Sequence, residues 1–241
     1  MLLRIATLLL SALGVAFAAG AGGMDQDPEA RALRQRFETL SVAGATLKDN
    51  FDGQTERRVT GPVTMGPGVR SAGNPADRAA SFPEDRSDAL YVYYGPVLPR
   101  RGRLSMDFRV DKLPRDHNFM TICSAGTAGN TKFYVRLGLD RRVTVCVLTR
   151  RENITLLSDP VELGRWHQLQ WWYAPEGSLL TIDGVVQDYS TDYCVPYAVE
   201  VGEAFYLGDQ PWWDAGSRQG IFYPLDSFVG LLDNLELVSL K

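Results

Sequence analysis

Acidic side chains are the first candidates for chemistry in this chain, because two carboxyl groups about 5 Å apart can hydrolyse a glycosidic bond. On a β-strand, two acids reach the same face only when they occupy alternate positions. Three candidate pairs are Glu84 with Asp85, Glu200 with Glu203, and Asp233 with Glu236. None of the three pairs has alternate spacing, so the sequence predicts no catalytic carboxylate pair on one strand.

Histidine chemistry is restricted as well, because His117 and His167 are the two histidines of the chain. A zinc site with three histidine ligands is therefore excluded, and a Ser-His-Asp site would need one of these two. The sequence contains no G-x-S-x-G elbow and no phosphate-binding glycine loop. We expect His167 to be structural, and we expect the protein to be non-catalytic.

Aromatic residues gather with acids in the loop from 208 to 227, which is the first candidate binding surface. An aromatic ring stacks on the apolar face of a sugar, while nearby acceptors bind the hydroxyl groups. The candidate ligand-binding residues in this loop are Trp212, Trp213, Tyr223, Asp209 and Asp214. The alternative is that at least one of the two tryptophans is structural and covers one end of the hydrophobic core as a lid.

A second candidate surface is the outward face of the central strands, which alternation places away from the core. Its candidate residues are Tyr134, Arg136, Gln168, Gln170 and Trp172. A solvated sheet face that binds no ligand would show the same pattern.

The elements that must position these residues are short strands. From Arg103 to Val110, large apolar residues alternate with polar ones, as on a half-buried strand. The same reading predicts strands at 119–124, 133–137, 143–147, 154–157, 166–173, 178–182, 204–207 and 231–240. Many short strands without intervening helices indicate an all-β fold, a two-sheet antiparallel β-sandwich. We expect loops, with at most one edge strand, between Gly61 and Arg86.

Four motifs in the second half of the chain resemble laminin G-like and pentraxin-like domains of the concanavalin A-like lectin/glucanase superfamily. They are the W-H-Q-L-Q-W strand at 166–171, the strand and D-G turn at 179–186, F-Y-L-G at 205–208, and F-V-G-L-L-D at 228–233. The resemblance implies a jelly-roll sandwich. Glycosidases of this superfamily carry E-x-D-x-x-E and its lyases carry Gln-x-His, and this chain has neither. The resemblance also leaves open whether a calcium ion binds at a loop rim, although the sequence has no dense run of acids at ligand spacing. No other cofactor is expected.

The N-terminus is expected to direct export. Residues 1–18 combine Arg4, an apolar stretch and Ala16-Phe17-Ala18, as in a signal peptide. Residues 19–46 are expected to form a helix and a spacer, and residues 47–241 the sandwich domain. The helix, from Asp25 to Leu40, should pack on its own domain, with partner binding as the alternative. The expected location is secreted, extracellular or periplasmic, with no membrane span after cleavage.

The cysteine count limits the possible disulfides, and the net charge limits the possible partners. Cys123, Cys146 and Cys194 are odd in number, and we expect buried free thiols because a third strand should separate the first two. The net charge of −4 over 241 residues disfavours nucleic-acid binding. Asn153-Ile154-Thr155 is a glycosylation sequon whose use the sequence leaves open.

Together these features predict a secreted, non-catalytic protein that binds carbohydrate or a surface polymer. The expected partner is a glycan or polysaccharide. Two alternatives stay open: a divergent glycoside hydrolase or polysaccharide lyase on the same fold, and a structural or adhesive protein that binds another surface protein.

Overall fold

The computed structural model describes residues 24–51, 55–57, 63–65, 70–74, 77–84, 91–94, 98–114, 118–127, 130–149, 151–197, 204–209, 212–214, 219–221 and 227–241. The predicted signal peptide, 1–18, lies outside these residues. Among the described residues, no helix combines the length and the hydrophobicity that crossing a bilayer requires.

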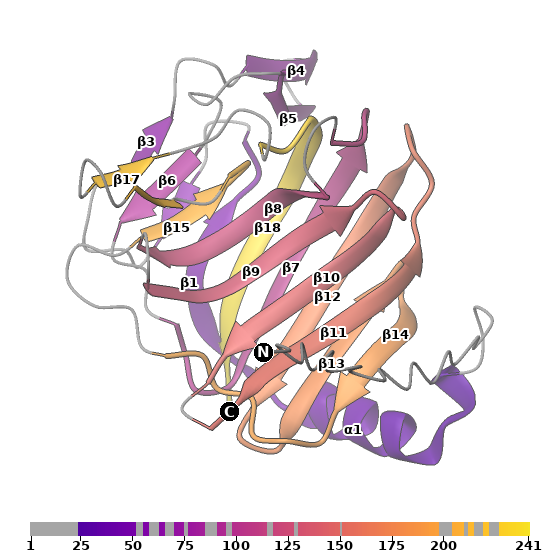
Figure 1. Ribbon diagram of the computed structural model, residues 1–241. Helices are drawn as coiled ribbons and strands as arrows, with labels where there is room; N and C mark the ends of the chain where they lie inside the picture. The colour runs from indigo at the N-terminus through magenta and orange to yellow at the C-terminus, as the bar shows by residue number, and fades with distance from the viewer. Residues whose placement is uncertain are drawn as a thin grey trace, which may run out of the picture.

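The described chain forms two large antiparallel sheets packed face to face (Figure 1). In the nine-stranded sheet, the order is β14 (Val185–Ser190), β13 (Gly177–Ile182), β12 (Trp166–Ala174), β7 (Gly102–Val110), β18 (Gly230–Leu240), β1 (Val42–Asp49) and β2 (Thr55–Arg57), with β5 (Asp77–Phe82) on β18 and β4 (Arg70–Asn74) on β5. The seven-stranded sheet runs β11 (Asn153–Pro160), β10 (Arg142–Leu148), β9 (Asn130–Gly138), β8 (Phe119–Thr127), β15 (Ala204–Leu207), β6 (Tyr91–Tyr94) and β3 (Val63–Met65). A separate hairpin joins β16 (Trp212–Asp214) and β17 (Gln219–Ile221). The predicted two-sheet β-sandwich is confirmed.

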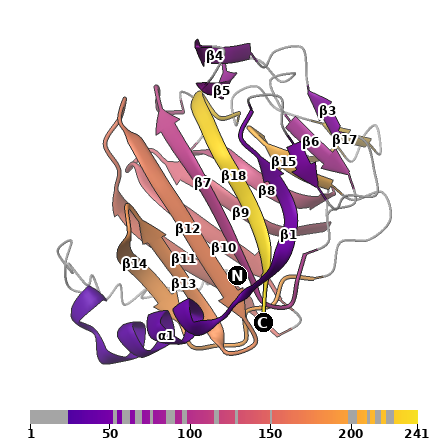
Figure 2. The same cartoon turned by 180° about the vertical axis from the view of Figure 1, so that it is seen from behind.

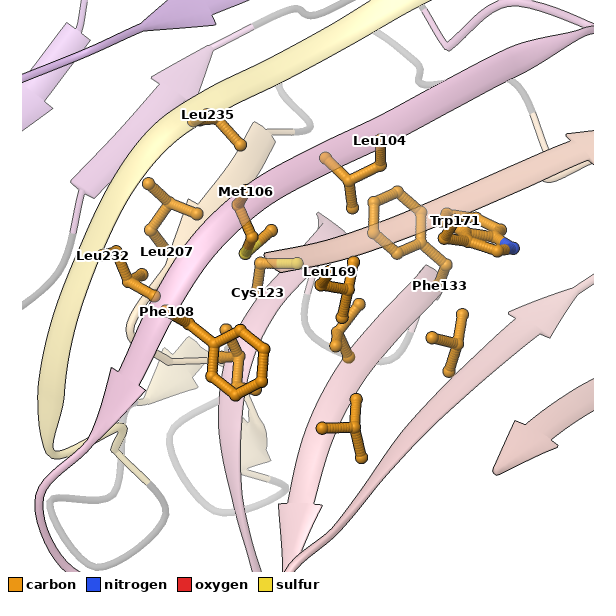
Figure 3. Close-up of a cluster of buried hydrophobic side chains, with 14 of the residues drawn as sticks. Leu104, Met106, Phe108, Cys123, Phe133, Leu169, Trp171, Leu207, Leu232 and Leu235 are labelled. Atoms are coloured by element: carbon orange, nitrogen blue, oxygen red, sulfur yellow. The ribbon is translucent and has the colours of Figure 1, made fainter. Parts of the chain in front are cut away.

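The core lies between the two sheets, and strand alternation explains it. On β7 the side chains of Leu104, Met106 and Phe108 are at most 1% exposed, while the residues between them are half-buried. Figure 3 shows these side chains meeting those of the opposite sheet. Phe133 of β9, in the seven-stranded sheet, packs against Trp171 of β12, in the nine-stranded sheet, with ring centroids 5.0 Å apart. Each apolar face is thereby removed from water, which is the main favourable term in folding.

The tight turn between β13 and β14 has the predicted D-G chemistry. Asp183 and Gly184 both have positive φ, 53° and 77°, which matches the right-handed twist of a hairpin. The Asp183 carboxylate reaches β12, where it accepts hydrogen bonds from the backbone N–H of Gln168 at 2.8 Å and pairs with Nδ1 of His167 at 2.8 Å. His167 is 6% exposed and its Nε2 contacts the backbone of Glu162, so both of its ring nitrogens are held by neighbouring groups.

The Asp183 carboxylate is stabilised in its charged form. Partial desolvation opposes ionisation, but the Gln168 N–H and the His167 ring together hold the pKa of Asp183 below its ordinary value. A carboxyl group with a lowered pKa contributes stability above its unfolded-state pKa and loses it as the pH falls through the folded-state pKa.

The stretch from 61 to 86 differs from its expectation, because it contains β3, β4 and β5 rather than loops with at most one edge strand. Small residues dominate β4 and β5, so hydrophobic alternation is too weak to reveal them. They become strands by pairing, with Ala80 opposite Leu232 of β18. Similarly, β1 begins at Val42, on the N-terminal side of the domain boundary expected at residue 47.

The N-terminal helix is confirmed as α1, Pro28–Thr39. The Asp27 side chain caps it by accepting hydrogen bonds from the N–H groups of Glu29 and Ala30. Its buried side chains, Leu33 and Phe37 among them, pack on the outer face of the nine-stranded sheet. In Figure 2, α1 crosses one end of that face, beside β13 and β14.

The three cysteines are free and buried, as expected. Cys123 lies on β8 and Cys146 on β10, with β9 between the two strands.

Removing the anchor of α1 should destabilise the protein. Phe37 is 2% exposed, so Phe37→Ala should lower the free energy of unfolding by about 3 kcal/mol. Urea denaturation measures this change, with Gln35→Ala on the exposed face of the same helix as the control. Equal effects of the two substitutions would show that the helix does not depend on its apolar face.

Because of the interactions of Asp183, the thermal stability of the protein should depend on pH in the acid range. We expect Asp183→Asn to lower the melting temperature at pH 7, and we expect this difference to shrink as the pH falls below about 4, where the native carboxylate becomes protonated. Thermal melts across pH 2–7 measure this, with Glu152→Gln, an exposed substitution, as the control. A difference that stays constant across this range would contradict the assignment.

Candidate functional site

The outer face of the nine-stranded sheet is divided between a covered end and an open end. Helix α1 covers Trp172, Leu179 and Val238 at one end. At the other end, no described helix or strand covers β18, β7 and β12 (Figure 2). Alternation turns polar residues of these strands outward, so the open end is a polar surface.

This open end is hollowed. A groove of about 900 Å³ is lined by Ala79, Ser81, Asp107, Arg109, Asp111, Trp166, His167, Gln168, Asp183, Leu231, Asp233 and Asn234. An adjoining hollow of about 290 Å³ is lined by Lys48, Asp49, Asn50, Arg103, Ser105, Met106, Asp107, Gln168, Gln170, Asn234, Leu235 and Glu236. Asp107, Gln168 and Asn234 line both, so the two hollows form one continuous surface, which we call the outer groove.

Trp166 is an exposed aromatic side chain that lines the outer groove. It lies at the start of β12 and is 41% exposed, unlike Trp171, which is fully buried on the inner face of the same strand. Trp166 is opposite Arg109 of β7, whose guanidinium carbon is 6.0 Å from the indole ring. A large ring held beside a charged side chain on a rigid strand offers a fixed apolar contact.

The floor of the outer groove consists of hydrogen-bonding groups. The side-chain amide of Asn234 donates to Asp107 at 2.8 Å, and Gln170 donates to Gln168 at 3.2 Å. Asn234 has a φ of 49° within a register shift of β18, where its N–H bonds the carboxylate of Asp233. This β-bulge turns Asn234 toward β7.

Two arginines of the outer groove are held in ion pairs. Arg109 donates two hydrogen bonds to Asp111, at 2.9 and 3.3 Å. Arg103 donates to Glu236 at 2.6 Å.

The structure separates the residues of the second candidate surface. Gln168 and Gln170 line the outer groove, whereas Trp172 is 8% exposed and packs beneath α1. Tyr134 and Arg136 lie on β9 of the other sheet. The outward faces of the two sheets point to opposite sides of the sandwich, so these residues cannot share one ligand.

Tyr134 and Arg136 form a different arrangement on their own sheet. The Arg136 guanidinium carbon is 3.9 Å from the Tyr134 ring centroid and 3.8 Å from that of Phe119. Desolvation, with a further contribution from Cys146, raises the pKa of Tyr134 to about 12, so its hydroxyl remains protonated at neutral pH.

The candidate residues of the 208–227 loop are only partly described. Asp209 is fully buried and accepts a hydrogen bond from the Ser227 hydroxyl at 2.6 Å. The backbone of Trp212, Trp213 and Asp214 forms β16, but their side chains lie outside the description. Tyr223 also lies outside the described residues. Binding by this loop therefore remains a prediction.

Among the described residues, no three His, Cys, Asp or Glu side chains are placed to hold a metal ion.

Sequence reasoning missed the outer groove as a unit. Trp166 was not among the predicted site residues, although its alternation with Gln168 and Gln170 is a signal for the outward face. Asp107 has the same signal on the alternating strand from Arg103 to Val110, but its contact with Asn234 has no local signal, because it depends on the register between β7 and β18.

Comparisons with known proteins identify the fold. No family model matches the chain. No curated protein matches it. Among solved structures, domain 4 of the GH43 extracellular arabinanase AbnA from Geobacillus stearothermophilus, in complex with arabinotriose, has a TM-score of 0.60 at 17% identity, covering 83% of this chain and 94% of that one.

Two further structures are similar in the same way. The binding domain of botulinum neurotoxin DC, in complex with SialylT, has a TM-score of 0.59 at 8% identity, covering 85% of this chain and 49% of that one. Trypanosoma rangeli sialidase has a TM-score of 0.51 at 14% identity, covering 83% of this chain and 29% of that one. At these identities the similarity establishes the fold and not the activity. The chain has the concanavalin A-like jelly-roll fold that its motifs predicted.

Proposed function

We propose that this protein is an exported, non-catalytic carbohydrate-binding protein, and that the outer groove holds the sugar. The observation that carries the proposal is the exposed indole of Trp166 in a groove otherwise lined mostly by hydrogen-bonding side chains. The export part rests on the signal-peptide pattern of residues 1–18.

The chemistry of the outer groove suits a sugar ring. A pyranose or furanose presents an apolar C–H face, which can stack on Trp166, and hydroxyl groups at its edge. Asp107, Gln168 and Asn234 supply fixed acceptors and donors within the same groove. Since these groups lie on paired strands rather than on a loop, they are positioned before the ligand arrives, which lowers the entropic cost of binding.

The fold comparisons support the same proposal. Two of the similar structures were determined with a glycan named in the complex, arabinotriose for the arabinanase domain and SialylT for the neurotoxin domain.

One observation favours the alternative of a glycoside hydrolase. Asp107 and Asp233 are directly opposite each other on β7 and β18. Such cross-strand neighbours have Cβ atoms about 5 Å apart, close to the separation of about 5–5.5 Å between the carboxyl groups of retaining glycosidases. Against catalysis, the Asp107 carboxylate already accepts the amide of Asn234.

Loss of the exposed indole should weaken binding. We expect Trp166→Ala to raise the Kd for a bound glycan by about tenfold or more, because about 1.4 kcal/mol of stacking is lost. A polysaccharide array followed by calorimetry measures this change. Tyr197→Ala is the control, since Tyr197 is also an exposed aromatic residue, 37% exposed, and does not line the outer groove.

The same array distinguishes the two candidate surfaces. If Trp166→Ala binds like wild type while the Trp212→Ala, Trp213→Ala double variant does not, the 208–227 loop holds the ligand instead. Silence of the wild type on every glycan would overturn the proposal.

Catalysis is tested on the same polysaccharides. We expect the wild type to release no reducing ends from any polysaccharide that it binds. Release that disappears in Asp107→Asn, at unchanged thermal stability, would establish the hydrolase instead.

A further inference from the structure

We infer that the outer groove selects uncharged glycans and rejects those that carry carboxylate or sulfate groups. This inference rests on the proposed function and adds the chemical class of the ligand. Among the described residues, five acids line the outer groove besides Asp49: Asp107, Asp111, Asp183, Asp233 and Glu236. The Asp49 carboxylate is buried and accepts a hydrogen bond from the core hydroxyl of Tyr93 at 2.9 Å, so it faces the core and not a ligand. Three bases face the five acids: Lys48, Arg103 and Arg109. The net charge of these lining residues is therefore negative.

The arginines of the outer groove are already engaged by the protein's own carboxylates. Proteins bind acidic ligands with the fork of donors on a guanidinium, two of which can hold one carboxylate. Arg109 directs two donors to Asp111, and Arg103 pairs with Glu236. An acidic sugar would have to displace these partners, and the displaced carboxylates would remain beside it. Lys48, the third base, is exposed and lines only the smaller hollow.

Carboxylates also lie where the ligand would contact the floor. Asp107 and Asp233 are neighbours across β7 and β18, and Asp183 lies at the β13–β14 turn. The hydrogen bonds that Asp183 accepts from the Gln168 N–H and its pairing with His167 favour its ionised form. A sulfate or carboxylate on the ligand would be repelled by each of them, by about fivefold in affinity per charge at low ionic strength.

Sugar hydroxyl groups, by contrast, should interact favourably with the same carboxylates. Every sugar hydroxyl has a proton to donate, and carboxylates are strong acceptors for it. The side-chain amides of Gln168, Gln170 and Asn234 can both donate and accept, so they fit hydroxyls in either role. The same residues that repel an anion therefore bind a neutral polyol.

The opposite face of the sandwich provides a contrast within the same protein. There Arg136 lies between Phe119 and Tyr134, which combines a cation with aromatic rings. Binding of an acidic glycan by that face would respond to Arg136 and not to the outer groove.

The test uses polymers matched in everything but charge. Polygalacturonate is compared with its methyl ester, and dextran sulfate with dextran, beside neutral arabinan, galactan, xylan and glucan. We expect the wild-type full chain to bind at least one neutral polymer and to bind charged counterparts at least tenfold more weakly at low salt. Added salt should narrow that difference, since it screens the repulsion.

Two variants assign the effect to the outer groove. The double substitution Asp107→Asn, Asp233→Asn removes two charges there and should raise affinity for the charged member of a pair by about fivefold or more relative to the neutral one. Glu152→Gln with Asp192→Asn removes two charges elsewhere and should leave the ratio unchanged. Thermal melts establish that both variants fold.

Each outcome decides between the two claims. Preference of the wild type for charged polymers, or an unchanged ratio in the groove variant, overturns the selectivity while glycan binding stands. If charged binding is lost in Arg136→Ala, the opposite face is the site and the inference is wrong. No binding to any polymer removes the proposed function, and this inference with it.

Discussion

The burial of one face of each central strand is the constraint on which the structure depends. On β7 and β12, every second side chain is removed from water into the space between the sheets, where Phe108, Leu169 and Trp171 are fully buried. Because the side-chain period of a strand is two, fixing this inner face fixes the outer face as well. A slip of one residue would place Trp171 in solvent and Trp166 in the core. The core therefore determines which side chains are available to a ligand.

The outer face is then divided by one helix. Helix α1 uses Leu33 and Phe37 to cover the apolar end of the sheet, where Trp172 would otherwise be exposed. No described helix or strand covers the polar end, whose outward residues are mostly hydrogen-bonding ones beside the exposed Trp166, and this end forms the outer groove. One end of these strands thus contributes to stability, and the other end forms the proposed binding site. The ion pairs of Arg103 and Arg109 neutralise both arginines, so the carboxylates in excess of the bases would set the charge of the open end.

The local sequence pattern was sufficient to predict most strands of the sandwich, but it was insufficient to predict the strands with the fewest large apolar residues. The strands from Arg103 onward, the capped helix and the D-G turn were predictable because each has a signal within a few residues. Strands β4 and β5 were not, because small residues give no alternation and the strands exist through pairing with β18. Among the candidate site residues, Gln170 could be assigned to an outward face, but its separation from Tyr134 and Arg136 required knowing which sheet each strand joins.

The sequence by itself determined the fold class, the buried and outward faces of each strong strand, and that at least one of the three cysteines has no intramolecular disulfide partner. These properties follow from side-chain period and from counting, which are local. Tertiary structure alone decided that Asp107 lies beside Asn234, that Trp172 is covered while Trp166 is exposed, and that Arg103 is paired with Glu236 of β18. Those outcomes depend on strand order, on register across β7 and β18, and on where a distant helix packs. Contacts between residues far apart in the chain carry no local signal, and the outer groove is built from such contacts.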